Sequence, residues 1–302
     1  MRYFTPSHWQ LPRGRLSLDE PIIMGILNTT PDSFSDGGLH LDPQDALETA
    51  MQMIRDGARV IDVGGESTRP GSQSVPPEEQ IRRTIPVIKR LRQEDPEVLI
   101  SIDTTNAAVA DRAIKAGADI INETSAALDD PKMLKVASRT RAGLILMHRR
   151  GTPDQETYST DVVSDLSSQQ IISHVRGFLL ERARAAIAAG IDRRSLVLDP
   201  GLGFGKTVEQ NCTLIARTRT VCQGYPALSA ASRKSFIGAT TGRDRPADRD
   251  PGSVAVTLTH FNAGVRLFRV HNVRAHADAL SIQRAIHGKK DQQISPRNNP
   301  SN

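Results

Sequence analysis

The sequence contains few cysteines and few aromatic residues. Its two cysteines, Cys212 and Cys222, are too few for a disulfide framework, and no cysteine–histidine cluster has the spacing of a zinc site. Aromatic residues make up 4% of the chain, and the basic residues behind the net charge of +5 are scattered among acidic ones. Nucleic-acid surfaces concentrate their charge and often add stacking rings. The composition therefore predicts no nucleic-acid partner, and the positive excess suits an anionic substrate.

Long apolar runs are also missing. No stretch approaches the roughly 20 apolar residues of a membrane-spanning helix, although a hydrophobic content of 38% is enough for a globular core. The first residues, MRYFTPSHWQLPRGRLSLDE, lack the continuous apolar segment of a signal peptide. We therefore expect no membrane association and a cytoplasmic location.

Eight short apolar runs recur along the chain, with longer amphipathic segments between them. They cover residues 22–27, 60–65, 98–103, 119–122, 142–148, 196–201, 227–232 and 265–271. Continuous apolar runs of this length are typical of strands buried on both faces of a parallel sheet. Eight strand–helix alternations predict an α/β fold consisting of a single (β/α)8 TIM barrel. A doubly wound sheet is the alternative, because a sequence does not show whether a sheet closes.

The segments between the runs have helical periodicity. Pro77, followed by Glu78 and Glu79, is predicted to open a helix, since proline and acids suit the exposed amides and dipole of a first turn. We expect residues 1–287 to form the barrel. Residues 288–302 are polar, contain proline and lack periodicity, so we expect a disordered tail there.

Almost every predicted strand ends in a polar residue. In a (β/α)8 barrel, this end of the strands holds the active site. One such residue alone is more often a helix cap or a satisfied core group. Eight on one face predict a polar pocket, formed by Asn28, Asp62, Asp103, Asn122, His148, Asp199, Ser232 and His271.

Three connections after these strands carry further signals. Residues 28–38 (NTTPDSFSDGG) and 64–71 (GGESTRPG) are long, which suggests mobile lids. Residues 232–235 (SRKS) place two cations at a strand end, and Arg269 and His271 share one face of the last strand because alternate residues do so. Cations at the ends of strands seven and eight predict a phosphate site.

The segment GLGFGKT (201–207) resembles a P-loop but is one residue short. A P-loop requires glycine at the position that Pro200 occupies. We therefore predict no nucleotide site there.

Read in order, these motifs resemble the dihydropteroate synthase family from Met24 to Val273. The matching segments are MGILNTTPDSFSDGG, VIDVGGESTRPG, SIDT, IIN, LMH, LDPGLGFGK, SRKS and RVHNV. The resemblance implies a transferase of folate biosynthesis that is a sulfonamide target. Its reaction condenses (7,8-dihydropterin-6-yl)methyl diphosphate with 4-aminobenzoate, which yields 7,8-dihydropteroate and diphosphate.

The resemblance also implies the role of each site residue. The pterin would be bound by Asp62, Asp103, Asn122, Met147, Asp199 and Lys234. The diphosphate would be bound by Asn28, Arg269 and His271, with Asn28 also contacting Mg2+, the implied cofactor. Thr68, Arg69 and Pro70 would close over the site, and Phe204 and Ser232 would line the aminobenzoate pocket. Catalysis would rest on Asp103, Lys234, Arg269 and His271, and the family resemblance suggests a homodimer.

The implied chemistry is substitution at a methylene group with cation character. Diphosphate would leave first, Asp103 would stabilise the charge on the pterin, and the uncharged arylamine would attack without a strong general base. A Ser–His–Asp or Cys–His arrangement is accordingly not needed.

Three positions depart from the family pattern. Glu123 replaces an aspartate, Ala230 replaces a glycine, and Asn272 replaces an aspartate that often follows the RVH motif. They leave open a pterin-binding paralogue with reduced or lost synthase activity. A pterin-binding methyltransferase that serves a cobalt cofactor is a further alternative, against which the SRKS motif and the complete first loop argue.

Overall fold

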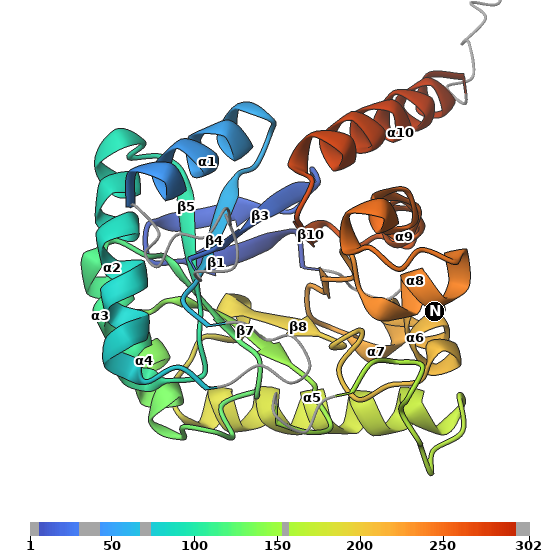
Figure 1. Ribbon diagram of the computed structural model, residues 1–302, viewed down its shortest axis with the longest axis horizontal. Helices are drawn as coiled ribbons and strands as arrows, with labels where there is room; N and C mark the ends of the chain where they lie inside the picture. Colours follow the sequence, from blue (N-terminus) through green and yellow to red (C-terminus); the bar gives the residue numbers. More distant parts are fainter. Residues whose placement is uncertain (1–5, 30–42, 67–73, 153–156, 294–302) are drawn as a thin grey trace, which may run out of the picture.

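Eight parallel strands form a nearly closed barrel at the centre of the molecule (Figure 1). The structure, a computed structural model, describes residues 6–29, 43–66, 74–152 and 157–293. The strands lie in the order β8-β7-β6-β5-β4-β3-β10-β9, and a bridge from Leu198 to Ala227 joins β8 to the residue before β9. This order confirms the predicted (β/α)8 barrel and rules out the doubly wound sheet. The strands are β3 (Ile22–Asn28), β4 (Val60–Gly64), β5 (Leu99–Asp103), β6 (Ile120–Glu123), β7 (Gly143–Met147), β8 (Leu196–Asp199), β9 (Leu228–Ser229) and β10 (Leu267–Val270).

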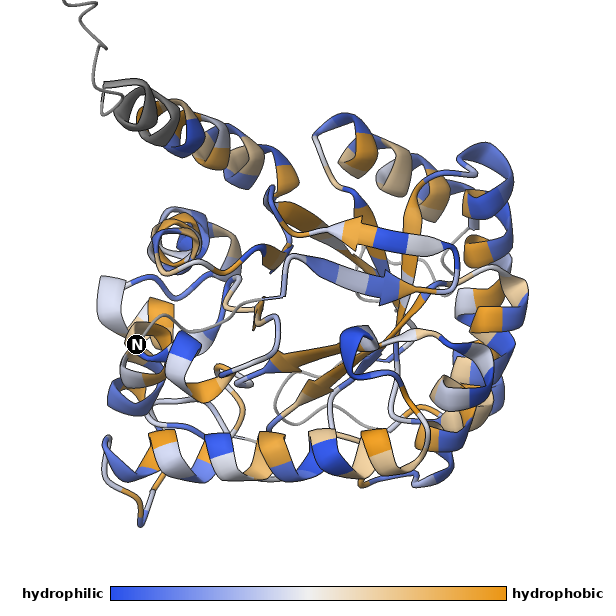
Figure 2. Ribbon diagram, turned by 180° about the vertical axis from the view of Figure 1, so that it is seen from behind, coloured by the Kyte–Doolittle hydropathy of each residue, from blue (hydrophilic) through white to orange (hydrophobic). Residues whose placement is uncertain are grey.

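Helices surround the barrel, and α2 begins at Pro77 with Glu78 and Glu79 in its first turn, as predicted. Figure 2 shows the strands mostly in apolar colours and the helices in alternating ones, as expected when each helix buries one side. The helices are α1 (Pro43–Arg55), α2 (Pro77–Glu94), α3 (Ala107–Ala116), α4 (Lys132–Thr140), α5 (Gln170–Ala188), α6 (Val208–Ala216), α7 (Thr218–Val221), α8 (Ser235–Thr241), α9 (Asp250–Asn262) and α10 (Val273–Gln293).

An antiparallel hairpin precedes the barrel and was not predicted. It comprises β1 (His8–Leu11) and β2 (Gly14–Ser17). Trp9 of this hairpin is fully buried, and its indole nitrogen donates to the carbonyl of Ser195, 2.9 Å away. A Cβ on Gly143 would lie 2.9 Å from the Trp9 ring, so this glycine gives the hairpin room against the start of β7. The hairpin thus closes the amino-terminal end of the barrel.

Side chains alternate between two apolar clusters along the strands. Ile22, Met24 and Val60 belong to an inner cluster that also contains Trp9, whereas Ile23 and Ile61 belong to the outer cluster under the helices. Because alternate residues of a strand share a face, positions further along the inner series point into the mouth of the barrel. These positions include Asp62, Asp103, Asn122, Asp199 and Arg269.

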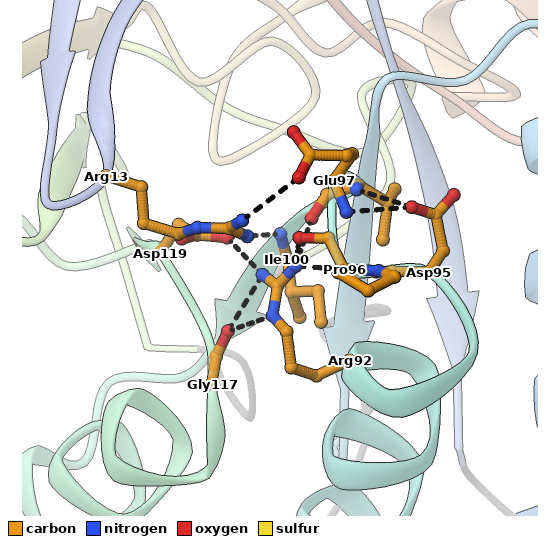
Figure 3. A network of polar contacts seen from close by, with 9 residues as sticks. Arg13, Arg92, Asp95, Pro96, Glu97, Ile100, Gly117 and Asp119 are labelled. Atoms are coloured by element: carbon orange, nitrogen blue, oxygen red, sulfur yellow. Dashed lines mark hydrogen bonds and ion pairs between the residues drawn. The ribbon is translucent and has the colours of Figure 1, made fainter.

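A polar network ties the connections at the amino-terminal ends of β5 and β6 (Figure 3). Arg92 of α2 donates to Asp119 Oδ2 at 2.7 Å and to the carbonyl of Val98 at 2.8 Å. The same Asp119 oxygen accepts from the amide of Ile100 at 3.0 Å. This network lies at the opposite end of the strands from the predicted pocket, so we assign it a structural role.

Helix α10 continues past residue 287, where we expected the barrel to end. It reaches Gln293, and the first proline beyond that point is Pro296. Lysine and glutamine are good helix formers, so polar composition alone does not end a helix. Residues 294–302 lie outside the described part of the chain. Among the residues that are described, we find no helix with both the length and the apolar character needed to cross a bilayer.

Candidate active site

Arg269 bridges two carboxylates at the mouth of the barrel. Its Nε donates to Asp62 Oδ2 and its Nη2 to Asp103 Oδ2, each at 2.6 Å. Asp62 is fully buried and Asp103 is 8% exposed. The three residues come from β4, β5 and β10, which lie around the barrel on either side of β3. The guanidinium of Arg269 therefore holds two acids in place. From the sequence we expected it to face a phosphate group.

Burial and neighbouring charges shift the pKa values of Asp103 and Arg269. Burial raises the pKa of Asp103, and the negative charge of Asp62 adds to this, while Arg269 and Lys234 lower it. Burial lowers the pKa of Arg269, but Asp62 and Asp103 outweigh that effect and raise it above its usual value. Arg269 therefore stays charged, and Asp103 depends on it for much of its own charge.

Asn122 and Asp199 extend this cluster. Asn122 Nδ2 donates to Asp62 Oδ2 at 3.0 Å, and Asp199 Oδ1 accepts from the amide of Gly201 at 2.7 Å. Burial raises the pKa of Asp199, whereas the Gly201 amide and the charges of Lys234, Lys206 and Arg269 lower it. Met147 is buried and pairs with Asp199 in the register of β7 and β8. The predicted pterin residues thus occupy neighbouring strand ends.

A second group of predicted site residues consists of Phe204, Lys234, Ser232 and His271. The ammonium of Lys234 lies 3.9 Å from the centre of the Phe204 ring, a cation–π contact. Ser232 Oγ lies 2.9 Å from His271 Nδ1 and accepts from the His271 amide at 3.1 Å. Burial, followed by the charges of Arg233, Arg269 and Lys234, lowers the pKa of His271 to about 3. At pH 7 this imidazole is therefore neutral.

Two polar residues expected at this mouth point elsewhere. His148 lies beside Met147, so it faces outward, and its ring packs against His174 and Phe178 of α5. Its membership in the pocket was a wrong prediction. Arg233 also turns away from the expected phosphate corner, because its guanidinium forms two bonds to Asp250, at 2.6 and 2.9 Å.

The structure describes only part of the two long loops. Asn28 ends β3 at the mouth, where its amide oxygen is 3.6 Å from the position a Cβ on Gly64 would take. The described part of the chain does not include Thr68, Arg69 and Pro70, nor residues 30–42 of the first loop.

Glu123 has a structural contact that explains its extra length. Its carboxylate accepts from the hydroxyl of Ser125 at 2.6 Å and from the amides of Ser125 and Ala127. Ala126 and Ala127 both have a positive φ, a conformation that these bonds help to hold. Glu123 therefore shapes the loop after β6 and does not face the barrel mouth, since it alternates with Asn122.

Lys206 was read from the sequence as part of two motifs, the segment resembling a P-loop and the family motif LDPGLGFGK, and was given no role of its own. It is fully buried, and its ammonium donates to the carbonyls of His148, Gly201 and Phe204. No periodicity of the sequence marks such a contact, because all three acceptors are main-chain atoms. A lysine directly after a glycine-rich strand end was the one available signal.

A nearly closed (β/α)8 barrel with acids, an amide and cations at its carboxyl-terminal mouth defines an enzyme that binds a small, polar and charged substrate. The comparisons with known proteins narrow this class. Residues 24–271 match the family model described as pterin binding enzyme.

Three proteins similar to this chain are described as dihydropteroate synthases. A dihydropteroate synthase of Streptococcus pyogenes serotype M3 (strain ATCC BAA-595 / MGAS315) is 44% identical over 262 residues, which cover 86% of this chain and 93% of the relative. The Xanthomonas albilineans dihydropteroate synthase solved with 4-aminobenzoic acid is 40% identical, with a TM-score of 0.84, and the match covers 96% of this chain and 99% of that one. The Burkholderia cenocepacia enzyme complexed with 7,8-dihydropteroate is 37% identical, with a TM-score of 0.83 and the same coverage. The chain belongs to the dihydropteroate synthase family and is a transferase, as the motifs predicted.

Proposed function

We propose that the residues at the barrel mouth condense (7,8-dihydropterin-6-yl)methyl diphosphate with 4-aminobenzoate to give 7,8-dihydropteroate and diphosphate. The observation that carries this assignment is the bridge of Arg269 between Asp62 and Asp103, beside Asn122 and Asp199. It concentrates acids for the pterin and a cation for the leaving group at one opening.

The pterin would lie against the acidic side of the mouth. A carboxylate facing a ring N–H and an exocyclic amine makes a two-pronged bond, and Asp199 and Asn122 offer the acceptors and donors for that edge. Asp62 Oδ1 is buried and makes no hydrogen bond with the described residues, so it adds an acceptor at the floor of the site. Met147, packed beside Asp199, supplies an apolar surface for the ring.

The diphosphate would lie between β10 and β3. Arg269 brings a permanent charge, and His271, which directly follows the last residue of β10, brings a ring donor. Asn28 ends the neighbouring strand β3, which pairs with β10. Departure of the diphosphate gathers negative charge, which these groups stabilise.

Asn28 also fits the implied Mg2+. No cluster of three or more His, Cys, Asp or Glu side chains suited to a metal occurs in the described part of the chain. Mg2+ commonly binds one or two protein oxygens and completes its shell with substrate phosphates and water. A single amide oxygen on Asn28 suits an ion of that kind. When bound, it would supply charge neutralisation to the diphosphate.

Asp103 would stabilise positive charge at the methylene carbon. Its carboxylate is held by Arg269 at the end of β5, and this contact favours the ionised form against the burial that raises the pKa of Asp103 to about 7. The C–O bond to diphosphate breaks, the arylamine nitrogen forms the C–N bond, and its proton is lost to solvent. Because the arylamine is uncharged near pH 7, positioning and charge stabilisation suffice.

Phe204, Ser232 and Lys234 would form the aminobenzoate pocket. Lys234 covers the Phe204 ring, which leaves a cation next to an apolar wall for a benzoate with one charge. Thr68, Arg69 and Pro70 would close over this pocket from the second loop.

We further propose that the protein is cytoplasmic. We also propose that it acts as a homodimer, as the family resemblance suggests.

The direct test is an assay with the pterin diphosphate, 4-aminobenzoate and Mg2+ that follows diphosphate release. We expect turnover that stops when Asp103 is replaced by Asn and persists when exposed Lys135 is replaced by Met. Pterin binding without turnover by the unmodified chain would instead indicate the binding-only paralogue.

A further inference from the structure

Lys206 occupies the centre of the loop that joins β8 to α6. Its side chain is completely buried, and its Nζ lies 2.8 Å from the carbonyl of Gly201, 2.9 Å from that of Phe204 and 3.2 Å from that of His148. Burying an ammonium is costly unless hydrogen bonds compensate it. Two carbonyls of this loop and one from the end of β7 thus surround one cation.

The three carbonyls belong to two strand ends that carry substrate residues. His148 directly follows Met147 at the end of β7, while Gly201 and Phe204 lie just after Asp199 at the end of β8. The contact between these ends is close, because a Cβ on Gly201 would lie 1.8 Å from the His148 oxygen. Gly201 also has a φ of +66°, which turns its carbonyl toward the lysine.

We propose that Lys206 is a positioning residue that fixes the loop bearing Phe204 and supports the negative charge of Asp199 from behind the site. This inference rests on the proposed roles of Phe204 and Asp199. Lys206 donates to three main-chain oxygens, so its effect on the substrates would pass through the residues that carry them.

The first effect is mechanical. Phe204 lies two residues before Lys206, and its own carbonyl is one of the acceptors. The Phe204 ring in turn carries the ammonium of Lys234 at 3.9 Å. Loss of the Lys206 ammonium would leave three buried carbonyls to find other donors, so the Phe204 backbone would shift and the aminobenzoate pocket with it.

The second effect is electrostatic. Asp199 is buried, and the charged groups that act on it are Lys206 from its own loop, Lys234 from the segment after β9 and Arg269 from β10. The negative charge of Asp199 in turn helps to raise the pKa of the buried Cys222 thiol. Burial favours the protonated acid, while the three cations favour the carboxylate, so removing one of them raises the pKa of Asp199.

Two variants separate these effects. Lys206→Met removes both the charge and the hydrogen bonds, while Lys206→Gln removes the charge but keeps an amide that can donate to the carbonyls. Lys135→Met, at an exposed site on α4, is the control for the same loss of net charge. Binding of 6-hydroxymethylpterin is measured by calorimetry from pH 5 to 9, and binding of 4-aminobenzoate is measured with pterin, pyrophosphate and Mg2+ present.

Both Lys206 variants should shift the pH at which pterin affinity falls upward by on the order of one pH unit. Lys206→Met should weaken aminobenzoate binding about tenfold, and Lys206→Gln by less. A folded Lys206→Met or Lys206→Gln with a lower melting temperature but an unchanged pH profile and aminobenzoate affinity would overturn the inference. If the unmodified chain itself fails to bind 6-hydroxymethylpterin, the proposed function fails instead.

Discussion

Nη2 of Arg269 donates to Oδ2 of Asp103, 2.6 Å away, while Nε of the same guanidinium donates to Asp62. The acid that would face the reacting carbon and the cation that would face the leaving group are therefore one bonded unit. A substitution at Arg269 must therefore change the protonation of Asp103, in addition to any effect of the substitution on diphosphate binding.

Replacement of Arg269 by Met should lower the free energy of unfolding by about 3 kcal/mol at pH 7, because it leaves buried carboxylates without their cation. The loss should be larger at pH 9. Burial raises the pKa of Asp103 to about 7 even with Arg269 in place, and without Arg269 it rises further, so above pH 7 the unmodified protein holds a paired carboxylate where the variant must keep the buried acid protonated. Urea titrations at both pH values measure this. The control is Arg274→Met, which removes an exposed pair with Asp278; equal losses at both pH values for Arg269→Met would contradict the expectation.

Replacement of Asp199 by Asn should weaken pterin binding by on the order of 2 kcal/mol, since a charge-assisted bond becomes a weaker and partly mismatched one. The asparagine oxygen can still accept from the Gly201 amide, so the melting temperature should change little. Calorimetry with 6-hydroxymethylpterin gives the affinity. A lower melting temperature with normal affinity would show that Asp199 serves only the turn.

Replacement of His271 by Gln should weaken pyrophosphate binding and leave 6-hydroxymethylpterin binding intact. Burial and three neighbouring cations lower the pKa of His271 to about 3, so the imidazole is neutral between pH 6 and pH 8 and would bind the diphosphate as an uncharged donor. The affinity lost in the variant should therefore be the same at pH 6 and at pH 8. Calorimetric titrations with pyrophosphate at both pH values measure it. Unchanged pyrophosphate affinity in the variant would place His271 outside the diphosphate site.

4-Aminobenzoate should bind weakly to the protein alone and well once pterin, pyrophosphate and Mg2+ are present. The reason is that the two long loops are expected to assemble on the bound diphosphate and complete the pocket of Phe204 and Lys234. Sulfonamides, which mimic aminobenzoate, should show the same dependence. Fluorescence or calorimetric titrations test both ligands, and tight binding of either to the protein without pterin would refute the order.

Replacement of His260 by Gln should reduce the loss of stability between pH 7 and pH 4. His260 is fully buried between Thr218 and Ser229, at 2.9 and 2.7 Å, and burial lowers its pKa to about 4. A lowered folded-state pKa means that the unfolded chain binds the proton first, so stability present above pH 6.5 is lost as pH falls toward 4. The shift is worth about 3 kcal/mol at most. Thermal unfolding at a series of pH values compares the two proteins, and parallel curves would exclude His260 as the cause.

The barrel strands were predictable because their segments consist almost entirely of apolar residues. Runs such as IIMGIL and LVL have no polar side chain, and a sheet buried on both faces accommodates that pattern. Each predicted run overlaps one strand of the barrel. The hairpin of Trp9 was missed because its strands are short and polar, and only the open end of the barrel gives the tryptophan a buried site.

The site was predictable in part from alternation along the strands. Asp62 and Arg269 follow the inner apolar residues of their strands by two positions, and Asp103 follows Leu99 by four. His148, in contrast, directly follows the inward Met147 and so faces α5. Applying that period to β7 would have removed His148 from the pocket. The pairing of Arg233 with Asp250 follows no local period, since it depends on where α9 packs.

By itself the sequence determined the eight-stranded barrel, the family and the strand ends at which polar residues gather, because apolar runs and motif order are local properties of the chain. The tertiary structure decided which of those polar groups are bonded to one another: Arg269 to the acids of β4 and β5, Ser232 to His271, and Lys206 to the carbonyls of two strand ends. These partners lie far apart along the chain or are main-chain atoms, which no side-chain pattern encodes. Tertiary packing brings them within hydrogen-bond distance, and burial there makes each unpaired charge costly enough to fix its partner.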